Sequence, residues 1–450
     1  MLKPPTRSSA LAIILVALFV AALIPRLWLA IEFPSSTGDG GRYNLVADNI
    51  RLNGCVSLSP VEGATCVPHA GGNQPPGYPI VIAATHYLFG FSARSVGVAQ
   101  AAVTAVTIAY ATWRLATMSS TPAAILAGIM LAFSFTSIAW SRLVFTESLT
   151  IVLSIIVLTE TLRLRSRPSL LIASWLGTCL AAATFLRYDG LILAVPVGVI
   201  LLWARPLRVS LPQIVTIGMI TIMPMVIWGA RNITNGLPAL SIEYVPKNGL
   251  PAPDGYIAWV STWVVNQFDY PNVMFPVASG SYRAITIPDT AYAGFNDRMA
   301  VEQALVELQS HDGQPFPANL DARFAELAEA RLNEVSLARH MNLYVQRAIH
   351  MWATPFFSSG WPVQVSANAR NNAQEGGLLA TAKANPVASM VKGTGTVYRI
   401  VLLFSAFGLA VVSIRRGYQI PATLLIAALA FATLRTGSFV ALGLTETRYL

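Results

Sequence analysis

Charged residues are scarce in this sequence. Only 11% of its 450 residues are charged, whereas a soluble domain carries roughly 25%. Together with a hydrophobic content of 54%, this scarcity excludes an ordinary soluble domain and predicts an integral membrane protein. The formal net charge of +9 would suggest a nucleic-acid partner for a soluble chain. Here the bases lie in short loops between apolar segments, so we expect no nucleic-acid partner.

Further absences narrow the function. The chain has no GxxxxGK[ST] loop and no GxGxxG after a strand, so we expect no nucleotide cofactor. The five histidines show neither HExxH nor close metal-ligand spacing, so the sequence identifies no metal site. Acids are not strung along the apolar segments either, which argues against an ion-coupled transporter.

Cysteine is also rare. Cys55 and Cys66 lie in a predicted outer loop, where oxidation is possible, and Cys179 lies in an apolar segment. A Cys55–Cys66 disulfide would contribute about 3 kcal/mol by constraining the unfolded chain. Two unpaired thiols are the alternative.

What the sequence does have is a series of long apolar segments. They predict an all-α polytopic membrane protein with about nine transmembrane helices and two long extracytoplasmic loops. The predicted spans are residues 10–30, 95–116, 122–140, 143–162, 170–186, 190–204, 212–229, 397–414 and 420–442. The first span is too long for a signal peptide and lacks a cleavage site, so we expect it to remain as an anchor.

Basic residues set the predicted orientation. With the N-terminus in the cytoplasm, one acid, Glu160, stands against the bases of the inner segments, and the opposite orientation would export nearly all of these bases. The bases are Lys3, Arg7, Arg114, Arg163, Arg165, Arg167, Arg205, Arg208, Arg415 and Arg416. We therefore expect a multi-pass protein of the cytoplasmic membrane with both long loops outside.

The predicted organisation follows from these spans. Its parts are a first transmembrane anchor (1–30), an extracytoplasmic loop with amphipathic helices (31–94), a bundle of six helices (95–229), a large extracytoplasmic loop or domain (230–396) and a C-terminal transmembrane pair (397–450). In the first loop, the periodicity over 43–50 predicts a helix that Gly54 ends, and the apolar run 80–91 is too short to cross. In the second loop we expect weak strand or irregular structure over 236–296 and helices over 297–309 and 319–347.

Acids of widely separated segments fall at the non-cytoplasmic ends of the predicted spans. They are Asp39, Glu147, Asp189 and Glu446. Carboxylates gathered on one face predict an outward-facing active site. Each has a structural alternative: Asp39 could be a helix N-cap, and Thr146 could cap a helix whose dipole Glu147 complements. Arg142 of the same hairpin could neutralise Glu147.

Arginines lie on the same face, against the positive-inside rule. Arg231 follows one predicted span, and Arg187 and Arg448 accompany the acids. The planar guanidinium suits phosphate, which we favour first for Arg231. The alternative is an arginine–carboxylate pair that ties helix ends, such as Arg187 with Asp189 or Arg448 with Glu446.

A set of short motifs follows in order along the chain. They are Asp39 with Tyr43, PPGYP (75–79), Phe-Gly (89–90), SRLVFTESL (141–149), LRYDGL (186–191), WGARNITNG (228–236) and Glu446-Thr447-Arg448-Tyr449. In this order and on one face they resemble the membrane-embedded GT-C glycosyltransferases, the group that includes protein O-mannosyltransferases and lipid A aminoarabinose transferases. The resemblance covers residues 1–240 and 395–450. Relatives often carry a second acid after the first, where this chain has Gly40.

The resemblance implies transfer of a sugar from a polyprenyl-phosphate donor to a lipid, glycan or protein acceptor at the outer face, among membrane lipids. Asp39 is then the base that takes the acceptor's hydroxyl proton. Arg231, with Arg187 and Arg448, stabilises the leaving phosphate. Glu147 orients the acceptor or the base, or binds a divalent cation. Tyr43, Asp189 and Glu446 complete the candidate substrate site, and the family favours inversion at the sugar carbon.

Two other functions stay open. A flippase for lipid-linked glycans would need polar groups near the membrane midplane, between repeats. A non-catalytic scaffold of the same fold is favoured by Gly40 and by the abrupt end after the last span. We expect acceptor choice to lie in residues 240–395.

Overall fold

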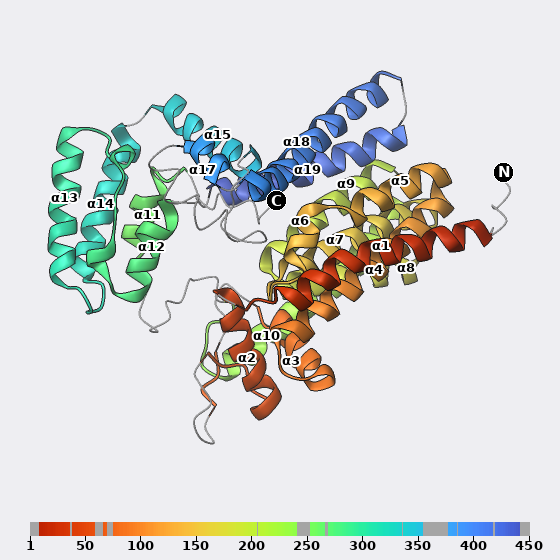
Figure 1. Ribbon diagram of the computed structural model, residues 1–450, viewed down its shortest axis with the longest axis horizontal. Helices are drawn as coiled ribbons and strands as arrows, with labels where there is room; N and C mark the ends of the chain where they lie inside the picture. The colour runs from red at the N-terminus through yellow and green to blue at the C-terminus, as the bar shows by residue number, and fades with distance from the viewer. Residues whose placement is uncertain are drawn as a thin grey trace. The chain divides into compact units, whose positions relative to one another are not determined.

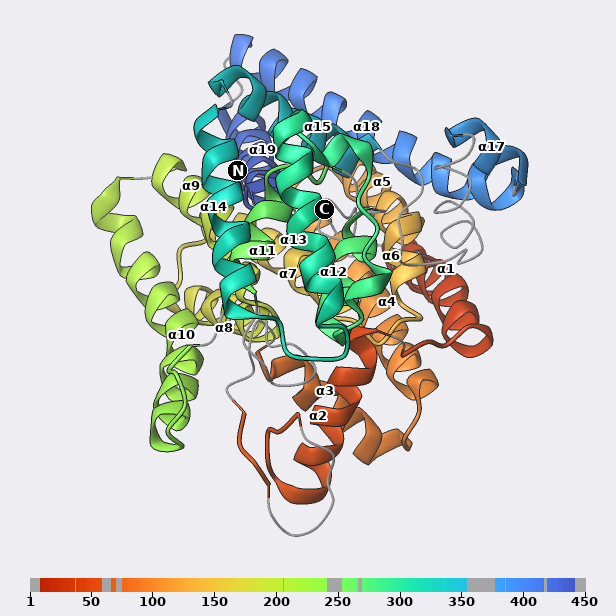
Figure 2. The same ribbon diagram turned by 90° about the vertical axis from the view of Figure 1, so that its left-hand side faces the viewer.

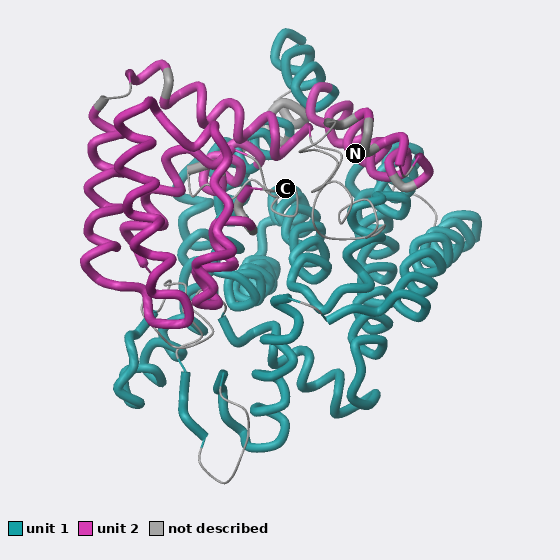
Figure 3. Tube along the Cα trace, turned by 60° about the vertical axis from the view of Figure 1, so that its left-hand side comes forward, with its two compact units in different colours: residues 1–242, 405–431 teal, residues 243–404, 432–450 magenta. Residues whose placement is uncertain are grey.

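The computed structural model describes most of the chain. The described residues are 9–36, 38–58, 66–69, 75–204, 206–240, 253–265, 269–334, 336–353, 377–384, 386–416 and 419–441. They are almost all helical, as predicted, and the only β pairing among them is one parallel bridge between Ser35 and Leu143 (Figure 1). The chain divides into two compact units, residues 1–242 with 405–431 and residues 243–404 with 432–450 (Figure 3).

The first unit holds the N-terminal helices. They are α1 (Ser9–Glu32), α2 (Asp39–Asn53), α3 (Gly77–Phe89), α4 (Ala93–Met118), α5 (Thr121–Ala132), α6 (Phe135–Trp140), α7 (Glu147–Ser166), α8 (Leu170–Leu186), the 3₁₀ helix η1 (Tyr188–Leu193), α9 (Ala194–Ala204) and α10 (Leu207–Thr234). The helix α2 ends immediately before Gly54, as predicted. The apolar run at 80–91 forms α3.

The second unit holds the helices that follow residue 243. They are α11 (Asp254–Ser261), α12 (Asp269–Ser279), η2 (Tyr282–Ala284), η3 (Asp289–Ala291), α13 (Phe295–Ser310), α14 (Ala318–Glu334), α15 (Leu337–Ala353) and α17 (Gly377–Ala384). The last helices, α18 (Pro386–Arg415) and α19 (Gln419–Ala441), contribute to both units.

Four helices among the described residues are long and apolar enough to cross a membrane. They are α1, α4, α10 and the segment Ser389–Arg415 of α18. Shorter apolar helices occur at Thr121–Ala132, Leu170–Leu186, Tyr188–Trp203 and Leu425–Phe439. All eight overlap predicted spans.

One predicted span, 122–140, is wrong as a single helix, because the chain breaks between α5 and α6. The buried guanidinium of Arg26 in α1 donates hydrogen bonds to the carbonyl oxygens of Ala132 (2.8 Å) and Leu131 (3.2 Å) and to Ser137 Oγ (3.0 Å). Carbonyls at a helix C-terminus have no partner within the helix and carry its negative dipole end. A cation from another helix therefore stabilises the interruption.

The prediction of strand or irregular structure over 236–296 is also wrong at 254–261 and 269–279, which form α11 and α12. The helix α11 lies beside α14 (Figure 2). Tyr256 and Trp259 of α11 pack with Phe324 of α14 in a common core. Both ends of α11 are capped from far along the chain. Asp321 Oδ1 accepts a hydrogen bond from the Tyr256 backbone N–H (2.9 Å), and Arg347 donates to the Val264 carbonyl (2.7 Å).

Apolar packing joins the helices of the first unit. One cluster links α7, α8, α9 and α10, with Leu176, Leu180 and Ile217 among its buried members. Another links α1, α4 and α5 through small residues such as Ala22 and Ala105. Within a membrane the hydrophobic effect does not drive helices together, because lipid tails are as apolar as the side chains. Small side chains let helices approach closely, so that van der Waals packing stabilises their contact.

Gly77, the first residue of α3, occupies a close approach that only glycine permits. A Cβ at this position would lie 2.2 Å from the carbonyl oxygen of Phe185 near the end of α8. The start of α3 therefore rests directly against the segment that leads into Arg187.

Replacing Gly77 with alanine is expected to lower the free energy of unfolding by roughly 1–3 kcal/mol, as overpacking does. The thermal unfolding midpoint of the detergent-solubilised protein measures the change. Gly218→Ala in α10 is the matched control, because a Cβ there meets no described atom within 4 Å. Equal midpoints for Gly77→Ala and Gly218→Ala would contradict this packing.

Candidate active site

Two segments of the first unit are held side by side, and each leads into a predicted catalytic acid. The backbone N–H of Ser35 donates to the Arg142 carbonyl (3.2 Å), and the N–H of Val144 donates to the Ser35 carbonyl (3.0 Å). Arg142 Nη1 donates to the Phe33 carbonyl (2.7 Å). Asp39 follows the first segment and Glu147 follows the second.

Gly40 brings the start of α2 against the same segment. It is buried, and a Cβ on it would lie 2.9 Å from the Val144 carbonyl oxygen. The second acid that relatives often carry at this position has no space here unless the 143–145 segment moves. Gly40 is thus explained by packing, and Asp39 stands one residue from the contact.

Buried polar side chains of α3 and α4 hold the 142–144 segment by hydrogen bonds. Tyr78 Oη donates to Gln100 Oε1 (3.1 Å), and Gln100 Nε2 donates to the Leu143 carbonyl (2.9 Å). The Tyr43 ring packs edge-on against Tyr78 with centroids 4.9 Å apart, so this substrate-site candidate is part of the packing of α2 on α3. Burial raises the pKa of Tyr78, and the neighbouring Tyr43 and Glu147 raise it further.

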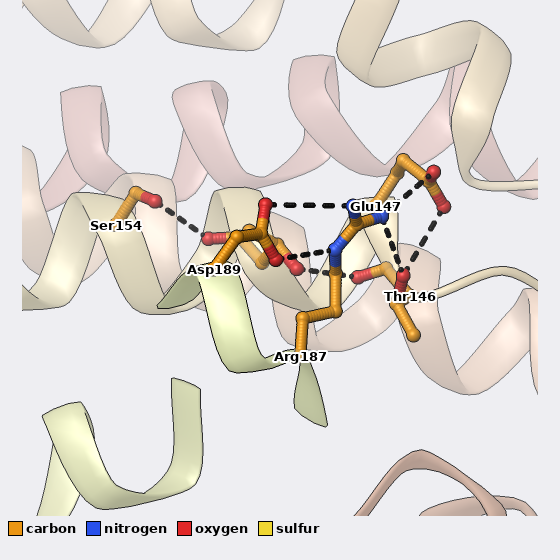
Figure 4. A network of polar contacts seen from close by, with 6 residues as sticks. Thr146, Glu147, Ser154, Arg187 and Asp189 are labelled. Atoms are coloured by element: carbon orange, nitrogen blue, oxygen red, sulfur yellow. Dashed lines mark hydrogen bonds and ion pairs between the residues drawn. The ribbon is translucent and has the colours of Figure 1, made fainter. Parts of the chain in front are cut away.

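Arg187 joins two of the predicted acids directly (Figure 4). Its Nη1 lies 3.2 Å from Glu147 Oε1, and its Nε lies 2.9 Å from Asp189 Oδ1. Glu147 is only 7% exposed, against 18% for Arg187 and 19% for Asp189. The pairing that the sequence offered as an alternative to phosphate binding is therefore present for Arg187.

Thr146 takes part in this cluster instead of capping α7. Its Oγ1 accepts a hydrogen bond from Arg187 Nη1 (3.2 Å) and donates to Glu147 Oε2 (3.4 Å). The Thr146 side chain makes no capping hydrogen bond at the N-terminus of α7. Similarly, α2 begins at Asp39 with Gly38 in the N-cap position, so Asp39 is not the N-cap residue. The carboxylate of Glu147 pairs with Arg187, whereas Arg142 binds the Phe33 carbonyl.

Arg231, near the end of α10, has different surroundings. Its Nη1 donates to the His69 carbonyl (2.9 Å) and to Asn232 Oδ1 (2.9 Å), and its guanidinium stacks on Trp228 at 4.7 Å. Within the described ranges no carboxylate pairs with Arg231. Its positive charge is therefore not compensated by any described acid.

His69 connects Arg231 with α2. Burial lowers the pKa of the His69 imidazole, and the positive charges of Arg42 and Arg231 lower it further. Both guanidinium groups therefore act on one imidazole. Arg42 lies three residues after Asp39, a spacing that makes the two side chains neighbours on the surface of α2.

A disulfide holds the segment that carries His69. Cys55 and Cys66 are bonded, with their Cα atoms 6.3 Å apart. The His69 backbone N–H also donates to the Val56 carbonyl (2.9 Å). These links fix the carbonyl that receives the hydrogen bond from Arg231.

Only some of the predicted site residues are brought together in the structure. Glu147, Arg187 and Asp189 are in direct contact. Asp39 precedes Gly40, which approaches the Val144 carbonyl three residues before Glu147, and Arg42 and Arg231 both lower the pKa of His69. Glu446 and Arg448 lie outside the described residues. No group of three potential metal ligands occurs in the part of the chain that was described.

Three residues of this region were missed in the sequence: Arg42, His69 and Gln100. Arg42 carried a usable signal, because its spacing from Asp39 fits one helical face. Gln100 was a lone amide within an apolar segment, and His69 seemed an ordinary loop histidine. Gln100 binds the carbonyl of Leu143 and the His69 carbonyl binds Arg231. These partners are so far apart in the sequence that residue spacing could not predict the contacts.

Residues 73–228 match the profile of a family described as dolichyl-phosphate-mannose-protein mannosyltransferase. The match confirms, over this region, the resemblance to the GT-C membrane glycosyltransferases. It includes Glu147, Arg187 and Asp189 and ends just before Arg231.

Two solved structures of ArnT from Cupriavidus metallidurans are also similar. The apo state has 15% identity and a TM-score of 0.42, covering 98% of this chain and 78% of that chain. The structure bound to undecaprenyl phosphate has 16% identity and a TM-score of 0.39, covering 96% and 77%. No curated protein matches this chain.

Removing one partner of the Glu147–Arg187 pair should be costly. Arg187→Gln leaves a buried carboxylate without its cation and is expected to lower the free energy of unfolding by about 3 kcal/mol. Thermal or denaturant unfolding in detergent measures this. Arg298, exposed and paired with Glu302 at 2.7 Å, is the control, since Arg298→Gln should cost less than about 1 kcal/mol. Similar losses for the two variants would show that the Glu147–Arg187 pair is not a buried constraint.

Proposed function

We propose that this chain transfers a sugar from a polyprenyl-phosphate donor to an acceptor at the outer face of the cytoplasmic membrane. The family match supports a membrane glycosyltransferase. The donor class follows from location, because nucleotide sugars are confined to the cytoplasm and an outward-facing site needs a sugar that has crossed on a lipid. The nine predicted spans and their basic inner loops support the outward orientation.

The observation that carries the proposal is the contrast between the two arginines. Arg187 is held by two carboxylates, whereas Arg231 has no carboxylate among the described residues. An uncompensated guanidinium at the outer end of an apolar helix is suited to an anionic ligand. We therefore assign the donor phosphate to Arg231 and assign Arg187 to the positioning of Glu147.

In the proposed step, Asp39 accepts the proton of the acceptor hydroxyl as the acceptor oxygen bonds to the anomeric carbon. The bond between that carbon and the phosphate oxygen breaks, and its electron pair leaves with polyprenyl phosphate. Arg231 stabilises the negative charge that develops on this leaving group. The family analogy favours inversion at the sugar carbon.

Glu147 is proposed to orient the acceptor. Its salt bridge with Arg187 fixes the position of its carboxylate, and Gln100 holds the Leu143 carbonyl of the segment that precedes it. Asp189 fixes the other side of the Arg187 guanidinium with a second hydrogen bond at 3.4 Å. Rigid support of this kind keeps reacting groups in a productive geometry.

Substitution of the two proposed catalytic groups should separate their roles. Asp39→Asn removes the base and is expected to lower kcat about 10²–10⁴-fold, with binding of polyprenyl phosphate retained. Arg231→Ala is expected to lower kcat about 10²–10³-fold and also to weaken binding of polyprenyl phosphate. Transfer from polyprenyl-phosphate-linked hexoses and pentoses in reconstituted membranes measures activity.

Arg94→Ala is the matched control, because Arg94 is an exposed arginine at the start of α4. It should retain both transfer and binding of polyprenyl phosphate. Full activity of Asp39→Asn would remove Asp39 as the base. Unchanged affinity of Arg231→Ala for polyprenyl phosphate would remove Arg231 from the phosphate site.

A further inference from the structure

The helix α15 presents an apolar face that no described side chain covers. Leu337, Met341, Val345 and Ile349 follow one another at four-residue intervals and are 77%, 54%, 50% and 59% exposed. This spacing places them along one side of the helix. Large apolar side chains gathered in this way mark an interaction surface.

The opposite side of α15 is bound to its own unit. Arg347 is buried and donates to the carbonyl oxygens of Val264 and Ser261 at the end of α11. Met351 is also fully buried. Since this side fixes the rotation of α15, the apolar face points away from the core of the unit.

The C-terminal end of α15 is tied to α19. Trp352 Nε1 donates to Thr436 Oγ1 (2.9 Å), and Met351 packs with Phe439. The helix α19 corresponds to the last predicted span, and in the outward topology of the proposed function residues 436–441 form its outer end. The end of α15 therefore lies at the level of the outer membrane surface, where tryptophan is typically found.

The charge of α15 fits the same location. Residues 337–353 contain two arginines, one of them the buried Arg347, two histidines and no acid. A helix with one apolar face, basic residues elsewhere and a hydrophobic content too low to cross is typical of an interfacial helix. A protein partner for such a face would carry acids to meet these bases, whereas anionic lipid headgroups supply that charge at the membrane itself.

We propose that α15 lies in the outer-leaflet interface, with Leu337, Met341, Val345 and Ile349 among the lipid acyl chains. Lipid is the partner that covers this face. The proposal uses the outward topology and not the transfer chemistry, so it does not depend on the roles of Asp39 and Arg231. Because a polyprenyl-linked substrate travels in the same layer, the helix holds its own unit where that substrate moves.

Nitroxide labels in the full-length protein test this placement. Single cysteines at Met341 and Val345 report the apolar face, and single cysteines at Asn342 and Gln346 report the polar sides. All are made in a Cys179→Ala background, which keeps the Cys55–Cys66 disulfide. The proteins are reconstituted in bilayers of phosphatidylcholine and phosphatidylglycerol, and accessibility to oxygen and to a water-soluble nickel complex is measured by power saturation.

The oxygen-to-nickel accessibility ratio is expected to be several-fold higher at residues 341 and 345 than at 342 and 346. Val306→Cys in α13 is the matched control, because Val306 is an apolar side chain that is 67% exposed outside this face. It should give the low, aqueous ratio. Equal ratios along α15 would overturn the proposal. Low accessibility to both reagents at 341 and 345 would also overturn it, since a second copy or another protein would then cover the face.

Discussion

Compensation of charge at the ends of apolar helices is the constraint on which the site depends. A buried carboxylate such as Glu147 is stable only with a cation and hydrogen bonds around it, and Arg187 and Thr146 supply them. Asp189 is the second carboxylate on the same guanidinium, so two acids share the one cation of Arg187. Arg231 donates hydrogen bonds to the His69 carbonyl and to Asn232 but to no described acid, and it stacks on the Trp228 indole ring. An anionic substrate would pair with the positive charge of Arg231.

Close backbone contacts hold the segments that carry these charged residues in place. The 33–35 and 142–144 segments are joined by main-chain hydrogen bonds, and Gly40 and Gly77 permit approaches that a methyl group would block. The Cys55–Cys66 bond and the His69 hydrogen bond fix the loop that meets Arg231. Main-chain groups held in this way are more rigid than long side chains alone, which suits a site that must align donor and acceptor.

Local patterns in the sequence predicted much of the helical fold. The helix before Gly54, the helix at 297–309 and most apolar spans depend on neighbouring residues, so periodicity is informative. The break between α5 and α6 and the helix α11 were not predictable in this way. Arg26 stabilises the first and Asp321 and Arg347 cap the second, and each of these side chains lies many residues from the helix it stabilises.

The candidate site was likewise predictable in its local features and not in its long-range contacts. The sequence identified Glu147 and Arg187 as candidate site residues, but it did not show which acid pairs with which arginine. The most direct test of the account is a cryo-electron microscopy structure of the protein with bound polyprenyl phosphate. The account predicts the phosphate within hydrogen-bond distance of the Arg231 guanidinium, with the Asp39 carboxylate facing the same cleft. Phosphate bound elsewhere, or Asp39 and Arg231 in separate clefts, would contradict it.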